Sequence, residues 1–198
     1  MKRRQYPWKK RKRPWLSSGE ALLNQPKNGY DRLSAEDEAA MRTYCEEYKR
    51  FLDAGKTERE VVDEVVRLAQ SKGFVPFVRG MAVNPGDRFY RVNRGKAVML
   101  AVIGQESLAE GASIGAAHID SPRLDLKPSP LYEDSELAYL KTHYYGGIRK
   151  YQWVSIPLEL HGVIVKADGS TVKVAIGTGA GEPLFTINDL LPHLAGEQ

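Results

Sequence analysis

Apolar and polar positions follow a helical period in the first patterned part of the chain, residues 34–55. Ser34 stands where a helix N-cap is expected, acidic residues fill the following turn, and Gly55 marks the end. The apolar positions recur three or four residues apart, at Met41, Tyr44, Cys45, Tyr48, Phe51 and Leu52. This spacing predicts an amphipathic helix.

Residues 57–73 repeat the same logic with a stronger start signal. Thr57 and Glu60 have the spacing of a capping box, and Gly73 stands at the expected stop. The apolar stripe consists of Val61, Val62, Val65, Val66, Leu68 and Ala69. The pattern predicts a second helix, joined to the first by a short turn.

After residue 86 the hydrophobic period changes toward two. The segments "DRFYRVNR" and "KAVMLAVIG" predict a β-hairpin that turns at Asn93, Arg94 and Gly95. Because residues 97–103 are apolar on both faces, we expect this second strand inside a sheet. The segment "ASIGAAHID" predicts a further strand, whose C-terminal end carries His118. In open α/β sheets, binding sites collect at such strand ends.

The hydrophobic pattern changes again near residue 130, where alternation typical of β-strands dominates. A hairpin is predicted over residues 160–176 with Asp168-Gly169 at its turn, and a helix only over residues 187–194. We therefore predict an α/β fold, with two helices and a mixed sheet followed by a β-rich module. The predicted divisions are a basic tail and linker over residues 1–30, an α/β part over 31–128, and a β-rich part over 129–198.

The net charge of +4 belongs to the N-terminus. Residues 1–15 hold eight of the 29 basic residues and no acidic one, which leaves 21 basic against 25 acidic residues in the remainder. Such a tail is a solvated, disordered arm, an over-extended translation start, or a sequence-independent binder of nucleic acid. We rank nucleic-acid binding last, because the rest of the chain offers neither a basic face nor an aromatic stacking pattern.

Cysteine usage and hydropathy narrow the class further. Cys45 is the only cysteine, so neither an intrachain disulfide nor a cysteine zinc cluster is possible. No apolar run reaches the roughly 20 residues of a membrane helix, and no apolar stretch follows the basic N-terminus as in a secretory signal. We expect a cytoplasmic protein without a membrane partner.

The chemistry of the chain is concentrated at His118 and Asp120. A histidine and an aspartate at a strand end fit a metal site in which the imidazole is the ligand and the carboxylate orients its ring. The alternative is a histidine bonded to a backbone carbonyl and an aspartate that caps the following turn. The tripeptide alone leaves both interpretations open.

Four segments together resemble the aspartyl aminopeptidase family, metallopeptidase family eighteen. They are "NPGDRFYRVNRGKAVMLAVIG", "GAAHIDSPRLDLKP", "HYYGGIRKYQWVSIPLELHGVIV" and "PLFTINDLLPHL", in the family's order and with similar spacing. The resemblance covers roughly residues 34–193. The stretch "KTHYYGGIRKYQW" is similar to a bacterial subgroup of that family.

The resemblance implies an exopeptidase with two zinc ions that removes an N-terminal residue, often acidic, from peptides. It also implies that His118 is the first zinc ligand and Asp120 the carboxylate that orients it. The family's catalytic domain is interrupted by a β-rich dimerisation domain, which predicts a homo-oligomer that contacts through residues 129–198. Asp189 and His193 lie in the segment that can reach a neighbouring subunit's substrate site.

A hydrolytic zinc site needs about three protein ligands per metal and a general base. By the same resemblance, the other ligands and the base lie beyond the inserted domain and are absent from this chain. We expect the 198-residue chain to be a truncated aminopeptidase, inactive alone. The main alternative is a non-catalytic oligomerisation module that pairs with full-length subunits.

Overall fold

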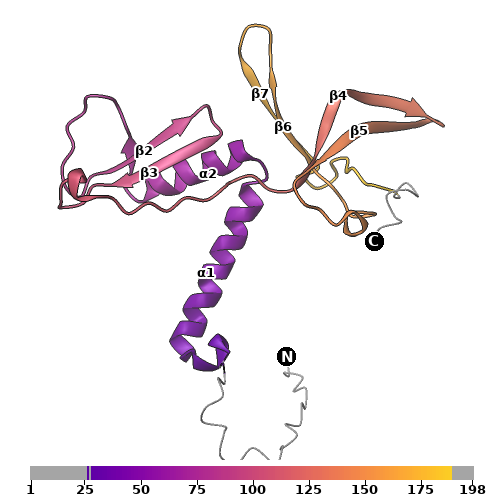
Figure 1. Ribbon diagram of the computed structural model, residues 1–198. Coiled ribbons are helices and arrows are strands. Elements are labelled where there is room, and N and C mark those ends of the chain that lie inside the picture. The colour runs from indigo at the N-terminus through magenta and orange to yellow at the C-terminus, as the bar shows by residue number, and fades with distance from the viewer. Residues whose placement is uncertain (1–25, 27, 189–198) are drawn as a thin grey trace, which may run out of the picture. The chain divides into compact units, whose positions relative to one another are not determined.

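The computed structural model describes residues 26 and 28–188 (Figure 1). By its contacts the chain divides into two units, residues 1–46 and 47–198, and helix α1 runs through the boundary. Most of the predicted basic tail lies outside the described residues, as do Asp189, His193 and the end of the predicted 187–194 helix. In the part that is described, no helix is both long and apolar enough to cross a membrane.

The first predicted helix is confirmed as α1, Ala35–Ala54, after a short 3-10 helix, η2, at Gly29–Arg32. Its start is held by a reciprocal pair: the Asp37 backbone N–H donates to Ser34 Oγ at 3.0 Å, and the Asp37 carboxylate accepts from the Ser34 N–H at 3.2 Å. None of its residues is buried. In the apolar stripe of α1, Met41 and Phe51 are half-buried, and Tyr44, Tyr48 and Leu52 are exposed.

The second predicted helix is confirmed as α2, Glu58–Ser71, with the capping box between Thr57 and Glu60. Its C-terminal turn closes through Gly73, whose φ of 81° suits glycine. Val61, Val62 and Ala69 of the predicted stripe are buried, and Val65, Val66 and Leu68 are half-buried. A Cβ atom at Gly55 would lie 2.7 Å from Val61 Cγ2, so the turn between the helices leaves no room for a side chain.

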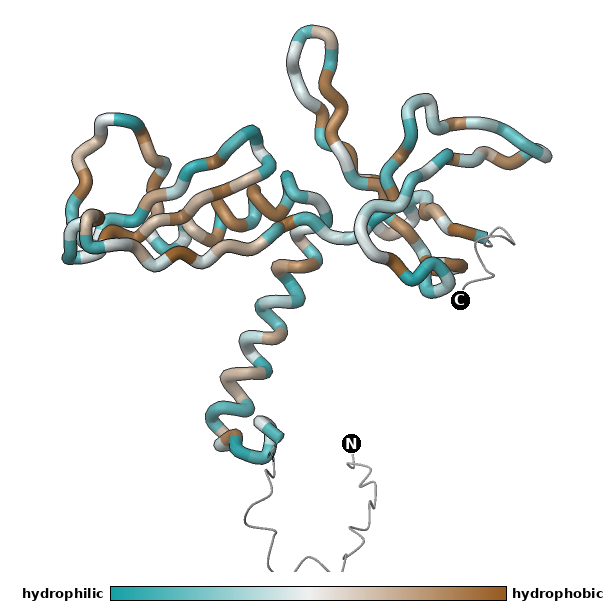
Figure 2. The backbone as a smooth tube through the Cα atoms, viewed as in Figure 1, coloured by the Kyte–Doolittle hydropathy of each residue, from teal (hydrophilic) through white to brown (hydrophobic). Residues whose placement is uncertain are grey.

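The buried face of α2 packs on a three-stranded sheet of order β1-β2-β3 (Figure 2). β1, Val75–Pro76, is parallel to β2, Arg88–Asn93, which pairs antiparallel with β3, Ala97–Val102. The predicted hairpin is confirmed, since Asn93 pairs with Ala97 across a turn in which Arg94 and Gly95 have positive φ angles of 53° and 64°. Phe89 of β2 is buried and meets Phe77 edge to face.

Two strand predictions fail in this region. β3 lies at an edge of the described sheet, and its Met99 side chain is 70% exposed. Residues 112–120 form no strand, although they are extended beyond the 3-10 helix η3, Leu108–Glu110. A strand exists only through hydrogen bonds to a neighbour, and no described segment pairs with residues 112–120. Ile114 is accordingly 86% exposed.

The predicted β-rich part contains two separate hairpins. β4, Arg123–Asp134, pairs with β5, Leu137–Tyr145, and β6, Leu160–Val165, pairs with β7, Thr171–Ile176. Gly169 at the turn of the second hairpin has a φ of 82°, which confirms the predicted Asp168-Gly169 turn. The predicted boundary between residues 128 and 129 falls inside β4, where the register shifts between Leu126 and Leu131.

The connection from β5 to β6 and the last described residues are mostly irregular. A short 3-10 helix, η4, spans Lys150–Gln152. Leu158 pairs with Phe185 and Val154 with Ile187 through isolated bridges. Ile187, where a helix is predicted to begin, is thus in a β-bridge.

Candidate metal-ligand site

The two residues singled out in the sequence are bonded to each other. His118 Nδ1 lies 3.0 Å from Asp120 Oδ1 and 3.0 Å from the Asp120 carbonyl oxygen. Both partners of Nδ1 are oxygen acceptors, so Nδ1 must carry the proton for these contacts to be hydrogen bonds. The sequence left open whether a carbonyl or a carboxylate contacts the ring, and in the structure both contact Nδ1.

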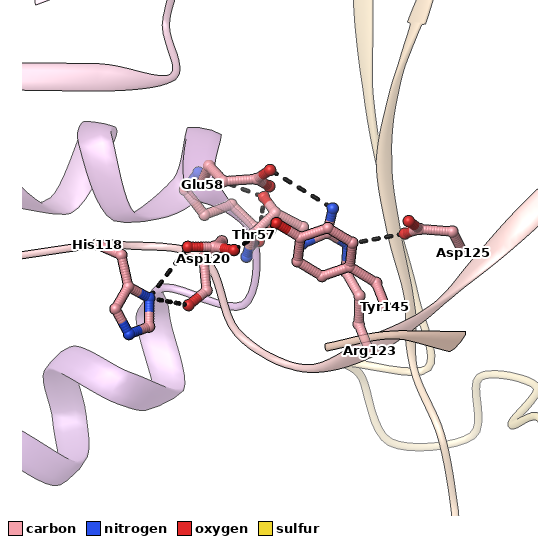
Figure 3. Close-up of polar contacts among 8 residues, drawn as sticks. Thr57, Glu58, His118, Asp120, Arg123, Asp125 and Tyr145 are labelled. Carbon is pink, nitrogen blue, oxygen red and sulfur yellow. Dashed lines mark hydrogen bonds and ion pairs between the residues drawn. The ribbon is translucent and has the colours of Figure 1, made fainter. Parts of the chain in front are cut away.

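The other ring nitrogen, Nε2, points away from Asp120 (Figure 3). Among the described residues no hydrogen-bond partner of Nε2 is seen, and the His118 side chain is 83% exposed. In the neutral form of the ring, a proton on Nδ1 leaves the lone pair on Nε2. Such a neutral imidazole, oriented by a carboxylate at its far nitrogen, is the usual form of a zinc-binding histidine.

Asp120 is itself held from a second direction. The Tyr145 hydroxyl donates to Asp120 Oδ2 at 2.6 Å, so both carboxylate oxygens have a donor. The Tyr145 hydrogen bond is the main cause that lowers the pKa of Asp120, with its own backbone N–H and His118 adding to the effect. The same bond raises the pKa of Tyr145. Asp120 therefore stays an ionised acceptor and Tyr145 a neutral donor.

Arg123 stands behind Tyr145 (Figure 3). Its guanidinium carbon lies 4.1 Å from the centre of the Tyr145 ring, within the range of a cation–π contact. Arg123 Nε donates to Asp125 Oδ1 at 2.7 Å, and Nη2 lies 3.5 Å from Glu58 Oε1. Burial alone would lower the pKa of Arg123, but the hydrogen bond with Asp125 and the charge of Glu58 outweigh it and raise the pKa.

Regular elements place these supporting side chains. Arg123 and Tyr145 are direct cross-strand partners at the open end of the β4–β5 hairpin, and Glu58 is the first residue of α2. The chain leaves β5 through Gly146, whose φ is 77° and where an added Cβ would lie 3.4 Å from Pro122. This tight exit keeps the end of β5 beside the segment that carries Asp120.

The sequence predicts that His118 and Asp120 act as a pair. It does not predict the supporting residues, which are Tyr145, Arg123 and Glu58. The nearest signal was the Tyr-Gly-Gly stretch at 145–147, quoted for the family resemblance without a role for Tyr145. The distances along the chain explain the omission, since Tyr145 is 25 residues from Asp120 and Glu58 is 65 residues from Arg123. Only the folded backbone shows that they meet.

The other described histidines have structural partners of their own. His143 stacks on Tyr144. His161 lies between two carboxylates, with Nδ1 2.7 Å from Glu60 Oε1 and Nε2 2.9 Å from Glu159 Oε2. Within residues 26 and 28–188 no three His, Cys, Asp or Glu side chains gather in a group that could hold a metal ion. His118 and Asp120 fit one ligand and its orienting partner, but not a complete site.

Comparison with known proteins gives this half-site a context. Residues 51–198 match the family model described as aminopeptidase I zinc metalloprotease (M18). The chain belongs to the M18 peptidase family. A probable M18 family aminopeptidase 1 from Clostridium acetobutylicum is 46% identical over 181 residues, or 89% of this chain, and one from Thermotoga maritima is 48% identical over 158 residues, or 79% of it.

Solved M18 structures share the fold. The crystal structure of aminopeptidase I from Borrelia burgdorferi B31 superposes with a TM-score of 0.78 at 39% identity, over 84% of this chain. The M18 enzyme from Thermotoga maritima gives a TM-score of 0.74 at 45% identity, over 88% of this chain. This M18 chain corresponds to 39% of the Clostridium relative and to 41% of the Borrelia structure.

Proposed function

We propose that this chain contributes the first zinc ligand to a zinc-dependent M18 aminopeptidase that removes an N-terminal residue, preferably an acidic one, from peptides. The observation that carries the proposal is the geometry of His118. Its Nδ1 is fixed by two oxygens of Asp120, while Nε2 is exposed. The description of the matched family as a zinc metalloprotease supports zinc as the metal.

Each residue has a distinct task in this proposal. His118 Nε2 would bind one of two zinc ions, and Asp120 would fix the Nδ1–H tautomer and the orientation of the ring. When bound, zinc polarises the scissile carbonyl and acidifies a bound water. The described residues provide neither the remaining ligands nor a general base, so we propose that the chain alone is inactive.

We further propose that the β-rich part, residues 129–198, mediates homo-oligomer assembly, and that either His193 or Asp189 reaches a neighbouring subunit's substrate site. Support comes from the β4–β5 hairpin, a two-stranded ribbon with exposed apolar side chains, among them Leu131 at 70%. Two-stranded hairpins are rarely stable alone in water. The same exposed ribbon favours the second candidate function, a non-catalytic module that joins the oligomer of longer M18 subunits.

A chimera tests the catalytic proposal. The part of the Clostridium acetobutylicum aminopeptidase that aligns with this chain is replaced by the chain, and hydrolysis of aspartyl- and leucyl-p-nitroanilide is measured. We expect zinc-dependent hydrolysis that His118→Ala reduces by roughly three orders of magnitude, because a catalytic zinc needs all of its ligands. His143→Ala is the matched control and should keep the activity. A folded chimera without hydrolysis, or with hydrolysis indifferent to His118→Ala, contradicts the proposal.

Size-exclusion chromatography tests the second candidate function, the non-catalytic assembly module. The 198-residue chain is mixed with the full-length Clostridium enzyme at increasing concentration. Co-elution supports an assembly role, and independent elution at every concentration excludes it.

A further inference from the structure

We propose that Tyr145 is a positioning residue for the His118–Asp120 pair, and that Arg123 holds Tyr145 in that position. The inference rests on the proposed function in one respect, that His118 is a metal ligand. The contacts themselves are independent of that role.

The segment that carries His118 and Asp120 needs an external restraint. No described strand pairs with residues 112–120, so a backbone ladder does not fix them. The pair is bonded within itself, but a bond between neighbours two residues apart does not tie the segment to the rest of the fold. The bond from the Tyr145 hydroxyl to Asp120 Oδ2 provides that tie, because it comes from β5, a regular strand.

The Tyr145 bond also determines which way the carboxylate faces. With Oδ2 bound to Tyr145 and Oδ1 to His118 Nδ1, the Asp120 side chain cannot rotate without breaking one of the two bonds. A carboxylate fixed in this way selects the Nδ1–H form of the imidazole and leaves Nε2 free for a metal. Without Tyr145, Asp120 is free to turn toward solvent.

Arg123 extends the restraint to helix α2. The guanidinium covers the Tyr145 ring at 4.1 Å and is itself bonded to Asp125 on its own strand and to Glu58 on α2. A planar guanidinium in two ion pairs has little freedom, so the ring beneath it is held as well. The start of α2, the end of β5 and His118 are thereby connected through side chains.

Two tyrosines of the same strand allow a matched test. Tyr145→Phe keeps the ring that Arg123 covers and removes only the hydroxyl. Tyr144→Phe removes a hydroxyl one residue away and keeps the ring contacts with His143 and Lys150. Arg123→Gln is a second variant, which leaves the Tyr145 hydroxyl in place but removes the cation above its ring.

The experiment measures the tautomer of His118 in the full 198-residue chain labelled with ¹⁵N-histidine. Long-range ¹H–¹⁵N spectra are recorded at about pH 8, above the ordinary histidine pKa. Zinc affinity is measured separately, in the chimera with the Clostridium enzyme. We expect the Nδ1–H form of His118 to dominate in the parent chain and in Tyr144→Phe. In Tyr145→Phe its ratio to the Nε2–H form should fall at least about twofold, and the zinc affinity of the chimera about tenfold. Arg123→Gln should shift the ratio in the same direction by less.

A variant counts as folded when its His161 resonances are unchanged, because these resonances report the contact between β6 and α2. An unaltered His118 tautomer in a folded Tyr145→Phe chain overturns the inference, as does an equal change in Tyr144→Phe. Global unfolding of Tyr145→Phe moves the test to Arg123→Gln, in which an unaltered tautomer also overturns it. If the tautomer changes as expected while His118→Ala leaves zinc in the chimera, the positioning role stands and the ligand role fails.

Discussion

Asp120 divides its two carboxylate oxygens between His118 and Tyr145, and this division shows what a sequence can and cannot reveal at the scale of residues. The bond to His118 joins neighbours two positions apart and was predictable from "HID" and the chemistry of metal-binding histidines. The bond to Tyr145 depends on how β4 and β5 pair, which no local pattern specifies. The contact of Tyr145 with Asp120 could therefore not be predicted from the sequence.

His161 provides a prediction about pH. Burial lowers the pKa of His161, but the hydrogen bonds with Glu60 and Glu159 outweigh it and raise the pKa above its ordinary 6.5. A raised pKa in the folded state stabilises the fold below the unfolded pKa, and the contribution disappears as pH rises through the folded pKa. The parent chain should therefore exceed His161→Gln in free energy of unfolding by about 1 kcal/mol near pH 6, with less difference toward pH 9.

Urea denaturation at a series of pH values measures this difference. His143→Gln serves as the control, since the His143 ring stacks on Tyr144 and is not placed between two carboxylates. A difference for His161→Gln that is constant with pH, or that grows as pH rises, would falsify the prediction.

At the scale of elements, start and stop signals predicted the helices well, whereas strand placement was predicted only where a turn is local. Ser34 and Thr57 cap the helix starts as expected, and the two predicted hairpins turn at the predicted residues. Residues 112–120 had the composition of a strand but have no partner among the described residues. Pairing depends on distant segments, so composition alone cannot establish it.

Gly55 tests the packing between the two helices. In Gly55→Ala the new Cβ would lie 2.7 Å from Val61 Cγ2 and 3.3 Å from the Phe51 carbonyl oxygen, so helix α2 must shift. We expect a loss of about 1–3 kcal/mol in the free energy of unfolding, typical of overpacking. Thermal denaturation measures it, with Gly162→Ala as control, because a Cβ at Gly162 meets nothing within 4 Å. Equal stability of the two variants would show that the turn is not tightly packed.

At the scale of the whole molecule, the chain spans only 35–39% of the length of three M18 relatives. Much apolar surface is exposed in the described residues, including Leu108, Ile114 and Met99. Four hydrophobic side chains there are buried, namely Val61, Val62, Ala69 and Phe89. So small a core and such open edges favour association with other protein surface.

The purified chain should self-associate and bind a hydrophobic dye, because its exposed apolar side chains are unshielded. Replacing two of them together, with Met99→Gln and Ile114→Ser, should reduce both effects. Light scattering after size exclusion measures the association, and dye fluorescence measures the exposed surface. A chain that is monomeric at every concentration and does not bind the dye contradicts this expectation.

The same chain should not release amino acids from aspartyl- or leucyl-p-nitroanilide with zinc present, since the described residues contain no group of three His, Cys, Asp or Glu side chains that could hold the metal. Release that disappears in His118→Ala would show that this chain completes a site by itself. Release that persists in His118→Ala would point to a contaminating peptidase.

The role of His118 as a zinc ligand is tested by the zinc content of the chimera with the Clostridium enzyme, measured by elemental analysis in the parent, His118→Ala and His143→Ala forms. If His118 is a metal ligand, His118→Ala loses zinc from the site that His118 helps to form, while His143→Ala keeps the parent's content. Equal zinc in the parent and in His118→Ala would contradict the assignment of His118 as a metal ligand.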